Sequence, residues 1–207
     1  MPGCAILLPA AGASQRMRGT GDKLLQEVQG RPLLRLVAER ACAVAAHVAV
    51  TVPPEPGARA CALRGLRVKQ LPVQRASEGL AASLREGALW AMGLGVEALM
   101  VILPDMPEIT SRDMRALIVA QARCPSRPLR ASTEAGTPGH PVILPRDLLP
   151  QMLTLSGDEG ARSTLTRHPP VLYPLRGARA LCDLDTPEAW NAWRATTSSS
   201  DVIIPDD

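Results

Sequence analysis

The alternation of short apolar runs with helix-like patterns is the feature of this chain that most limits its fold. Apolar runs typical of buried strands occur at residues 4–8, 48–52, 66–71, 99–103 and 141–144. Most of these runs are separated by segments such as 32–47, in which apolar residues recur at roughly helical intervals. Strands that alternate with helices form parallel sheets, because each helix returns the chain to the same end of the sheet. The sequence therefore predicts an α/β fold with a mostly parallel sheet.

Two further helices have recognisable starts. Thr110 and Asp113 have the spacing of a capping box, in which a hydroxyl and a carboxylate satisfy open amides at the helix terminus. The segment 186–188, Thr-Pro-Glu, is typical of a second helix start. We expect helices to begin at both places.

The length of 207 residues suits one domain with a well-developed core, and no Pro/Gly/Ser-rich linker interrupts the chain before its end. Residues 196–207 begin rich in Ser and Thr and lack periodicity. We therefore predict a single domain over residues 1–195 and a flexible C-terminal tail over residues 196–207.

The composition argues against several classes of protein. A net charge of +3 and an aromatic content of 2% argue against binding of polymeric nucleic acid, because few side chains could stack on bases. Five cysteines without a C-x-x-C pair argue against a disulfide framework or a zinc site. The apolar runs are too short to span a membrane, and the N-terminus lacks a signal-peptide pattern. We expect a cytoplasmic protein that binds small molecules rather than nucleic acid or a membrane.

A glycine-rich, cationic loop follows the first apolar run. Its glycines and basic residues are Gly12, Gly19, Gly21, Arg16, Arg18 and Lys23. Glycine lets backbone N–H groups approach an anion, and Lys23, one of only two lysines, supplies a compact ammonium that suits a phosphate oxygen. The spacing matches neither G-x-x-x-x-G-K-[ST] nor G-x-G-x-x-G, which argues against the ATPases and dinucleotide-binding proteins that carry them. The loop therefore predicts a phosphate site of another kind, with a plain surface loop as the alternative.

Carboxylates follow a second predicted strand and recur near the C-terminus. Asp105 comes directly after the run 99–103, and ligands of open α/β sheets bind beyond the carboxyl ends of strands. A carboxylate there could hold Mg²⁺, whose remaining positions take phosphates and water, or it could cap the next turn. Asp183 and Asp185 lie two residues apart, so in an extended segment they point to the same side. One of them could face Asp105 while the other serves as a turn residue or helix cap.

The loop reads A-A-G-x-S-x-R-M over residues 10–17, and K-L-L at 23–25 and G-R-P-L-L at 30–34 follow it. This pattern resembles the start of the MobA-like nucleotidyltransferases, and within them the molybdenum cofactor cytidylyltransferases. Further matching segments follow in the same order, at residues 78–84, 103–107, 139–142, 157–162 and 183–188. One departure is Arg18, which stands between Met17 and Gly19 where the family usually has Gly directly after Met. The resemblance spans nearly the whole chain and is therefore more specific than any single motif.

The resemblance implies a Rossmann-like, three-layer nucleotidyltransferase fold and an Mg²⁺-dependent enzyme. It implies transfer of CMP from CTP to the terminal phosphate of a molybdopterin-type cofactor, with release of pyrophosphate and a molybdoenzyme as receiver of the product. No nucleophile–base pair is evident in the sequence. This suits nucleotidyl transfer, which needs positioning and charge neutralisation more than covalent catalysis.

The resemblance also implies roles for particular residues. The catalytic residues would be Arg16, Lys23 and Asp105, and Mg²⁺ would lie on Asp105 and Asp185, with Asp183 as the weaker candidate. The nucleotide would be bound by Ala10, Ala11, Gly12, Ala13, Ser14, Arg16, Lys23, Gly79 and Ser83. The acceptor would contact His140, Asp158 and Arg162. Without the resemblance, Gly79 and Ser83 read as packing positions and His140 as a partly buried turn residue.

The preference for CTP rests on Ala11, because the cytidylyl branch begins Ala-Ala-Gly whereas the guanylyl branch commonly has Ala-Gly-Gly. Three alternatives stay open. They are a GTP-using molybdenum cofactor guanylyltransferase, a cytidylyltransferase that acts on a sugar or polyol phosphate, and a non-enzymatic carrier of the molybdenum cofactor. Release of pyrophosphate separates the enzymes from the carrier, and screening of acceptors separates the two cytidylyltransferases.

Overall fold

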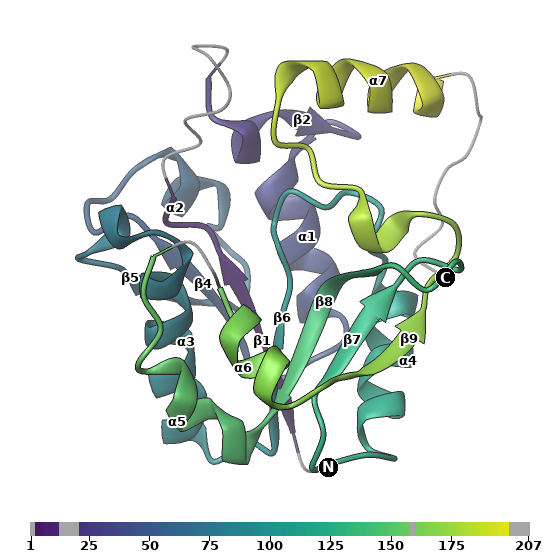
Figure 1. Cartoon of the computed structure of the whole chain (residues 1–207). Helices are drawn as coiled ribbons and strands as arrows, with labels where there is room; N and C mark the ends of the chain where they lie inside the picture. Colours follow the sequence, from purple (N-terminus) through teal and green to yellow (C-terminus); the bar gives the residue numbers. More distant parts are fainter. Residues whose placement is uncertain (1–2, 13–20, 158–159, 199–207) are drawn as a thin grey trace.

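The computed structural model describes residues 3–12, 21–157 and 160–198, and in them a seven-stranded sheet carries helices on both faces (Figure 1). The strands lie in the order β5-β4-β1-β6-β8-β7-β9. Pairing is parallel from β5 through β4 and β1 to β6, antiparallel from β6 through β8 to β7, and parallel again between β7 and β9. The predicted α/β architecture with a mostly parallel sheet is thus confirmed.

The strands of this sheet are β1 (Cys4–Pro9), β4 (Val48–Val52), β5 (Lys69–Pro72), β6 (Ala98–Val101), β7 (Leu129–Ser132), β8 (Pro138–Pro145) and β9 (Val171–Pro174). A separate short ribbon pairs β2 (Glu27–Val28) with β3 (Arg31–Pro32). The α-helices are α1 (Leu33–Cys42), α2 (Ala58–Ala62), α3 (Leu80–Leu94), α4 (Ser111–Gln121), α5 (Leu149–Met152), α6 (Arg162–Arg167) and α7 (Pro187–Ser198). Single 3₁₀ turns are η2 (Lys23–Leu25), η3 (Ala76–Glu78), η4 (Arg146–Leu148) and η5 (Arg179–Leu181).

The central strand β1 is buried on both faces. Ala5 and Leu7 belong to the core under α3 and α5, whereas Ile6 and Leu8 belong to the core that α1 and α4 cover. A strand covered on both sides needs apolar residues at every position, which is why its sequence reads as a continuous apolar run.

Gly87 sets how closely α3 approaches β1. A Cβ at this position would lie 2.1 Å from a methyl group of Leu7, so only glycine lets the helix pack this near to the strand. Gly79, with φ of +81°, forms the bend at which α3 begins. Both glycines therefore fix the position of the N-terminal turn of α3.

The boundaries of several elements differ from those that the sequence predicts. The apolar side chains of Leu66 and Val68 pack on the core before β5 starts, so the strand runs over Lys69–Pro72 rather than 66–71. The helix expected over 32–47 ends at Cys42, because the chain must turn back to β4. Helix α7 continues to Ser198, past the boundary expected at 195, and Thr196 donates a side-chain hydrogen bond to the Trp193 carbonyl. The rest of the expected tail, from residue 199, lies outside the described residues.

The two helix starts read from the sequence are present. Thr110 and Asp113 form a reciprocal capping box at the start of α4. At the start of α7, Thr186 Oγ1 accepts a hydrogen bond from the Ala189 amide at 3.2 Å. Within the described residues no helix has the length and apolar character needed to cross a membrane.

Candidate active site

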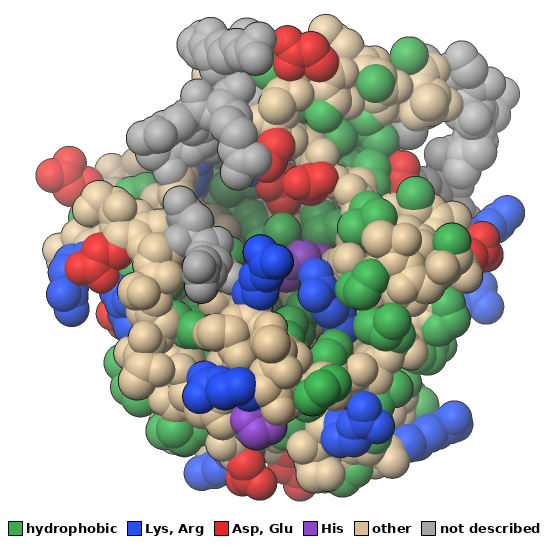
Figure 2. Space-filling model, viewed as in Figure 1, with side chains coloured by type: hydrophobic (Ala, Val, Ile, Leu, Met, Phe, Trp, Pro, Cys, Tyr) green, Lys and Arg blue, Asp and Glu red, His purple; other side chains and the backbone are tan. Residues whose placement is uncertain are grey.

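A pocket lies at the carboxyl end of β1, where the strand order reverses. β4 and β6 flank β1 on opposite sides, so the connections that leave these strands diverge and open a crevice between them. The pocket has a volume of about 640 Å³. Figure 2 shows the hollow near the middle of this face, with acidic side chains on one border and basic and histidine side chains on the other.

The pocket brings together residues that lie far apart in the sequence. The predicted site residues that line it are Ala10, Ala11, Gly12, Lys23, Gly79, Ser83, Asp105, Asp183 and Asp185. They come from the loop after β1, the turn η2, the start of α3, the loop after β6 and the segment before α7. The fold therefore places these nine residues around one pocket, and their functional roles stay predictions.

Two open backbone amides belong to residues that line the pocket after the end of β1. The Ala10 amide donates to Thr51, to its carbonyl at 3.1 Å and its hydroxyl at 3.0 Å, which fixes the chain as it leaves the sheet. The next two amides, of Ala11 and Gly12, have no hydrogen-bond partner within the described residues. Open N–H groups in a pocket are suited to an anion such as a phosphate.

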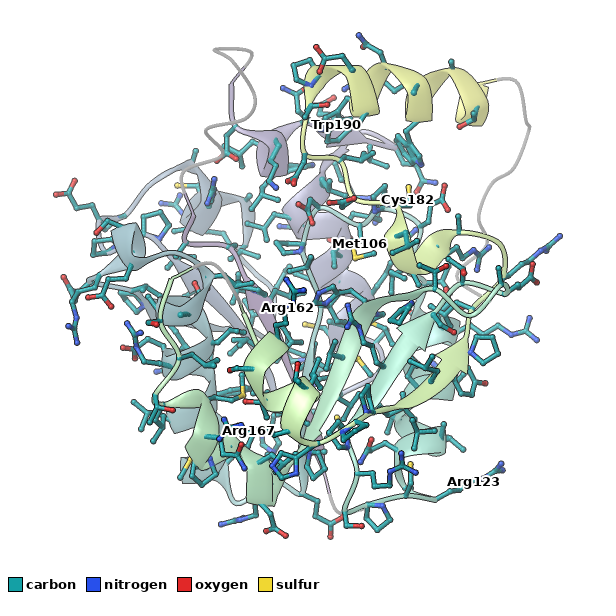
Figure 3. All side chains as sticks on the ribbon, viewed as in Figure 1. Met106, Arg123, Arg162, Arg167, Cys182 and Trp190 are labelled. Carbon is teal, nitrogen blue, oxygen red and sulfur yellow. The ribbon has the colours of Figure 1, made fainter. Side chains whose placement is uncertain are left out.

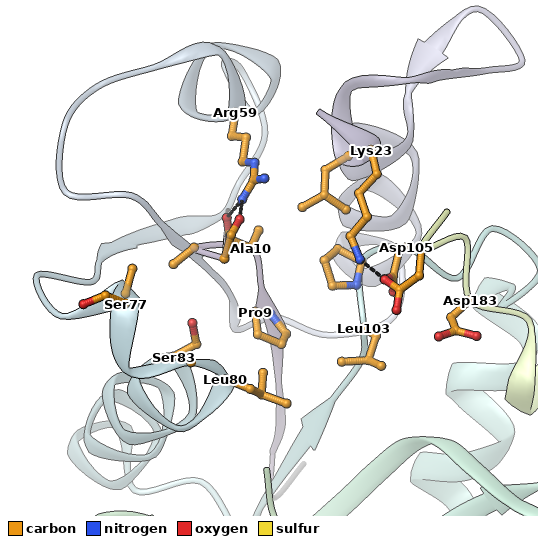
Figure 4. A pocket seen from close by; sticks show the side chains of 17 residues that line it. Pro9, Ala10, Lys23, Arg59, Ser77, Leu80, Ser83, Leu103, Asp105 and Asp183 are labelled. Carbon is orange, nitrogen blue, oxygen red and sulfur yellow. Dashed lines mark hydrogen bonds and ion pairs between the residues drawn. The ribbon is translucent and has the colours of Figure 1, made fainter. Parts of the chain in front are cut away.

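Lys23 lies beside Asp105 in the pocket (Figure 4) and contacts two carboxylates there. Its Nζ donates to Asp105 Oδ2 at 2.5 Å and also to Asp185 Oδ1. Asp22, the N-cap residue of η2, holds the turn in place by accepting a hydrogen bond from the Leu24 amide at 3.0 Å. Lys23 is therefore carried by a hydrogen-bonded 3₁₀ turn, which fixes the backbone from which its ammonium extends.

Burial and charge act against each other at this ion cluster. Burial disfavours the ammonium of Lys23, but the carboxylates of Asp105 and Asp185 outweigh it and raise the pKa of Lys23 above the ordinary lysine value. Burial raises the pKa of Asp105, and the nearby Asp185 carboxylate raises it further, although Lys23 acts in the opposite direction. The positive charge of Lys23 is therefore what allows the two carboxylates to lie near each other.

Asp185 reaches this cluster because the chain before α7 is tied to the loop after β6. The Leu184 amide donates to the Asp105 carbonyl at 3.0 Å, and the Leu184 side chain is buried in the core. Asp185 then contacts Lys23, whereas Asp183 is exposed on the pocket wall (Figure 4). The structure thus brings Asp105 together with Asp185, the member of the pair that the family resemblance favours.

The donor set at this cluster suits a hard divalent cation that also binds substrate. Asp105 Oδ1 is buried and has no hydrogen-bond partner within the described residues. No group of three or more His, Cys, Asp or Glu side chains gathers there or elsewhere in those residues. Mg²⁺ is commonly held by one or two carboxylates, with phosphates and water completing its coordination, so Asp105 and Asp185 fit that role.

Two of the predicted acceptor residues, His140 and Arg162, are not among the described residues that line the pocket. His140 lies in β8, and Arg162 is the exposed first residue of α6, which packs on the same face of the sheet as α3 and α5 (Figure 3). Four other predicted residues, Ala13, Ser14, Arg16 and Asp158, lie outside the described residues.

The imidazole of His140 is held neutral. Burial lowers its pKa to about 4, and the Arg130 guanidinium beside it acts in the same direction. Arg130 is fixed by its Nε, which donates to the Gly139 carbonyl at 2.8 Å. His140 Nδ1 is buried without a hydrogen-bond partner among the described residues. A neutral imidazole has one nitrogen that donates and one that accepts a hydrogen bond, so His140 is a polar group that adds no charge to that of Arg130.

This lowered pKa predicts how stability depends on pH. Between the folded pKa of about 4 and the ordinary value of 6.5, the unfolded chain binds more protons than the folded one. The contribution of His140 to stability is therefore complete above that window and is lost as the pH falls through it. We expect wild type to lose more stability than His140→Gln between about pH 7 and about pH 4.5, measured by urea unfolding. Equal losses would contradict the neutral buried state.

Sequence reasoning missed Arg59, a buried pocket residue in α2. It contacts Asp22, which lies 37 residues earlier in the chain, and the carbonyls of Ala10 and Gly12. No local motif marks it, because nothing in the sequence distinguishes it from the other arginines.

Comparison with known proteins gives a family match over most of the chain. A family model described as the MobA-like NTP transferase domain matches residues 5–171. The 2-C-methyl-D-erythritol 4-phosphate cytidylyltransferase of Cereibacter sphaeroides is 30% identical over 146 residues. That alignment spans 67% of this chain and 64% of the relative, so the chain covers less than two thirds of the relative's length.

Solved structures share the fold over nearly the whole chain. Rv0371c from Mycobacterium tuberculosis superposes with a TM-score of 0.73 at 24% identity, covering 95% of this chain and 98% of that one. Another structure of Rv0371c, a complex with manganese, gives a TM-score of 0.70 at 20% identity, with 92% and 97% covered. CMP:2-keto-3-deoxy-manno-octonic acid synthetase complexed with CTP gives 0.73 at 15% identity, with 95% and 99% covered.

Proposed function

This chain belongs to the MobA-like NTP transferase family, and on that premise we propose that it transfers CMP from CTP to the terminal phosphate of a molybdopterin-type acceptor. The observation that carries the proposal is one pocket in which the open amides of Ala11 and Gly12 lie in the same cavity as Lys23 and the carboxylates of Asp105 and Asp185. Such a site offers charge neutralisation without a nucleophile of its own, as nucleotidyl transfer requires.

In the proposed reaction, an oxygen of the acceptor phosphate attacks the α-phosphorus of CTP in line with the bond to the β-phosphate. A new P–O bond forms, the bond between the α-phosphorus and the bridging oxygen breaks, and pyrophosphate leaves. The amides of Ala11 and Gly12 would donate to the phosphate chain. Lys23 would leave the carboxylates and neutralise the β- and γ-phosphates, together with Arg16, whose role the family resemblance implies.

The carboxylates of Asp105 and Asp185 would hold Mg²⁺, which supplies neutralisation of phosphate charge and orientation of the reacting groups when bound. A divalent cation is also suggested by the fold relative Rv0371c, one structure of which is a complex with manganese. Asp105 contributes through position as well, because its backbone carbonyl accepts the hydrogen bond that anchors the segment carrying Asp185.

The proposed preference for cytosine rests on the wall formed by Ala11. Its methyl group is buried and packs with Val73 and Ala82 beside the pocket. A β-carbon there narrows the site and restricts the backbone angles, which favours the smaller pyrimidine. A CTP complex of a fold relative and the cytidylyltransferase relative support the same donor.

We expect wild type to have a higher kcat/KM for CTP than for GTP, and Ala11→Gly to narrow that difference. The measurement is pyrophosphate release with each nucleotide in the presence of the acceptor. Ala82→Gly, which changes the neighbour that Ala11 packs against rather than Ala11 itself, is the matched control. A clear wild-type preference for GTP would contradict the proposed use of CTP without affecting the proposed phosphate site.

A polyol phosphate acceptor is the second candidate, favoured by the relative from Cereibacter sphaeroides that is named a 2-C-methyl-D-erythritol 4-phosphate cytidylyltransferase. The molybdopterin proposal rests on the segments 139–142 and 157–162, where the family resemblance assigns His140, Asp158 and Arg162 to the acceptor. The deciding experiment offers CTP and Mg²⁺ with either acceptor. If pyrophosphate is released with the polyol phosphate as acceptor but not with the molybdopterin-type acceptor, the second proposal replaces the first.

A further inference from the structure

We propose that Arg59 is a positioning residue for nucleotide binding, which holds the backbone at Ala10 and Gly12 and the side chain of Asp22 in fixed positions. Ala10 and Gly12 follow the last residue of β1, and Asp22 is the N-cap residue of η2, directly before Lys23. Arg59 approaches these residues from α2, with a side chain that is only 9% exposed (Figure 4). The proposal rests on the proposed function in one respect, namely that this pocket takes a nucleoside triphosphate.

The guanidinium of Arg59 uses separate nitrogens for the two ends of the loop. Nη1 donates to the carbonyls of Ala10 and Gly12, both at 2.6 Å. Nε and Nη2 donate to the two carboxylate oxygens of Asp22, at 2.6 Å and 2.9 Å. This is the bidentate arrangement that a planar guanidinium forms with a carboxylate. One side chain therefore joins residues on both sides of the loop.

The contact with the Ala10 carbonyl also sets the direction of an open amide. In a trans peptide unit the C=O of one residue and the N–H of the next point to opposite sides. Because Arg59 holds the Ala10 carbonyl, the N–H of Ala11 is directed away from Arg59, and this is one of the two amides without a partner in the described residues. Arg59 also binds two carbonyl oxygens that would otherwise be free to repel a phosphate.

The contact with Asp22 also helps to fix the position of the Lys23 ammonium. Asp22 caps η2 by accepting a hydrogen bond from the Leu24 amide, and Lys23 lies on that turn. A lysine in place of Arg59 could reach one or two of these acceptors, but it lacks the planar fork that serves two carbonyls and a carboxylate together. The role therefore requires arginine rather than positive charge alone.

The test compares Arg59→Ala and Arg59→Lys with the matched control Arg35→Ala. Arg35 donates to the carbonyls of Ala62 and Arg64, at 2.9 Å and 3.0 Å, at the far end of α2 and away from the pocket lining. Its loss removes similar bonds from the same region without touching the loop. CTP binding with Mg²⁺ is measured by calorimetry, and KM and kcat are measured by pyrophosphate release. Amide hydrogen exchange of residues 10–12 and 21–24 is measured without nucleotide.

We expect Arg59→Ala to raise the Kd for CTP by about a hundredfold, the usual scale for loss of preorganised positioning. Amide exchange of residues 10–12 and 21–24 should become faster in Arg59→Ala. Arg59→Lys should recover part of both effects, and Arg35→Ala should stay near wild type. Wild-type binding and exchange in Arg59→Ala would overturn the proposal. If Arg59→Ala does not fold, full wild-type behaviour of Arg59→Lys would overturn it instead.

Failure of the proposed function gives a different result. If wild type binds neither CTP nor GTP, the assignment of the pocket to a nucleotide is wrong, whereas faster exchange in Arg59→Ala still supports the positioning role of Arg59. If wild type binds CTP and Arg59→Ala leaves both binding and exchange unchanged, the positioning role is wrong and the nucleotide site stands.

Discussion

Replacing Asp105 by Asn is expected to lower the rate of nucleotidyl transfer by about three orders of magnitude, the effect of losing several kcal/mol of charge stabilisation. Asparagine keeps the size of the side chain but removes the charge that faces Lys23 and would hold the metal. The measurement is kcat/KM for CTP over a titration of Mg²⁺. We expect the loss to persist at high metal concentration, because a neutral amide oxygen binds the cation weakly.

The same substitution is expected to leave stability unchanged or to raise it. Burial raises the pKa of Asp105, so folding disfavours its charged form. In the window between the ordinary pKa and the raised one, the folded state binds more protons than the unfolded state, and the stability of wild type falls as the pH rises. Asp105→Asn should lack this fall in urea unfolding. A variant that is markedly less stable than wild type would point to a structural role for Asp105.

Asp185→Asn and Asp183→Asn serve as matched variants within the same pocket. Asp185 contacts Lys23, so its variant should resemble Asp105→Asn in its Mg²⁺ requirement. Asp183 is exposed, and its side chain makes no hydrogen bond within the described residues, so we expect a milder loss. If Asp183→Asn proves the more damaging, the assignment within the pair is wrong although the site survives.

The parts of the fold that follow from local patterns could be predicted from the sequence. The capping box at Thr110 and the continuous apolar run of β1 report directly on helix termini and on burial from both faces. Asp105 could be placed on the binding edge because the end of a parallel strand determines where ligands bind. Strand direction could not be predicted, since the run at 141–144 is equally apolar in a parallel and an antiparallel pairing, and β8 is antiparallel to β6.

The parts of the site that depend on distant contacts could not be predicted. Arg59 acts through carbonyls and a carboxylate that only the folded chain brings near it. The choice between Asp183 and Asp185 depends on how the buried side chain of Leu184 orients the segment, and spacing alone leaves both carboxylates on one side. The family resemblance narrowed this choice where the residue pattern did not.

Replacing Lys23 by Ala is expected to lower transfer by two to three orders of magnitude, about the effect of removing one preorganised charge from an electrostatic site. The variant also leaves two neighbouring carboxylates without their shared cation. Stability should therefore drop, by about 1–3 kcal/mol for the partly buried groups that lose a partner. The measurements are kcat/KM for CTP and the free energy of unfolding.

A second measurement tests whether Lys23 contacts the carboxylates of Asp105 and Asp185 without nucleotide and moves to the phosphates when the nucleotide binds. Without nucleotide, its ammonium contacts the carboxylates of Asp105 and Asp185, the two side chains that we assign to the metal. Lys23→Ala should therefore bind Mn²⁺ more tightly than wild type in the absence of CTP, as measured by electron paramagnetic resonance or calorimetry. Added Mn²⁺ should also restore more stability to the variant than to wild type, because it replaces the missing positive charge.

Lys69→Ala is the matched control, since Lys69 is the only other lysine of the chain and is exposed on β5. It should leave transfer, stability and Mn²⁺ binding near wild-type values. Lys23→Met, which keeps part of the apolar stem, should match Lys23→Ala in activity if charge is what matters. Wild-type activity in Lys23→Ala would refute the phosphate role, whereas lost activity with unchanged Mn²⁺ binding would show that Lys23 and the metal do not compete for the same carboxylates.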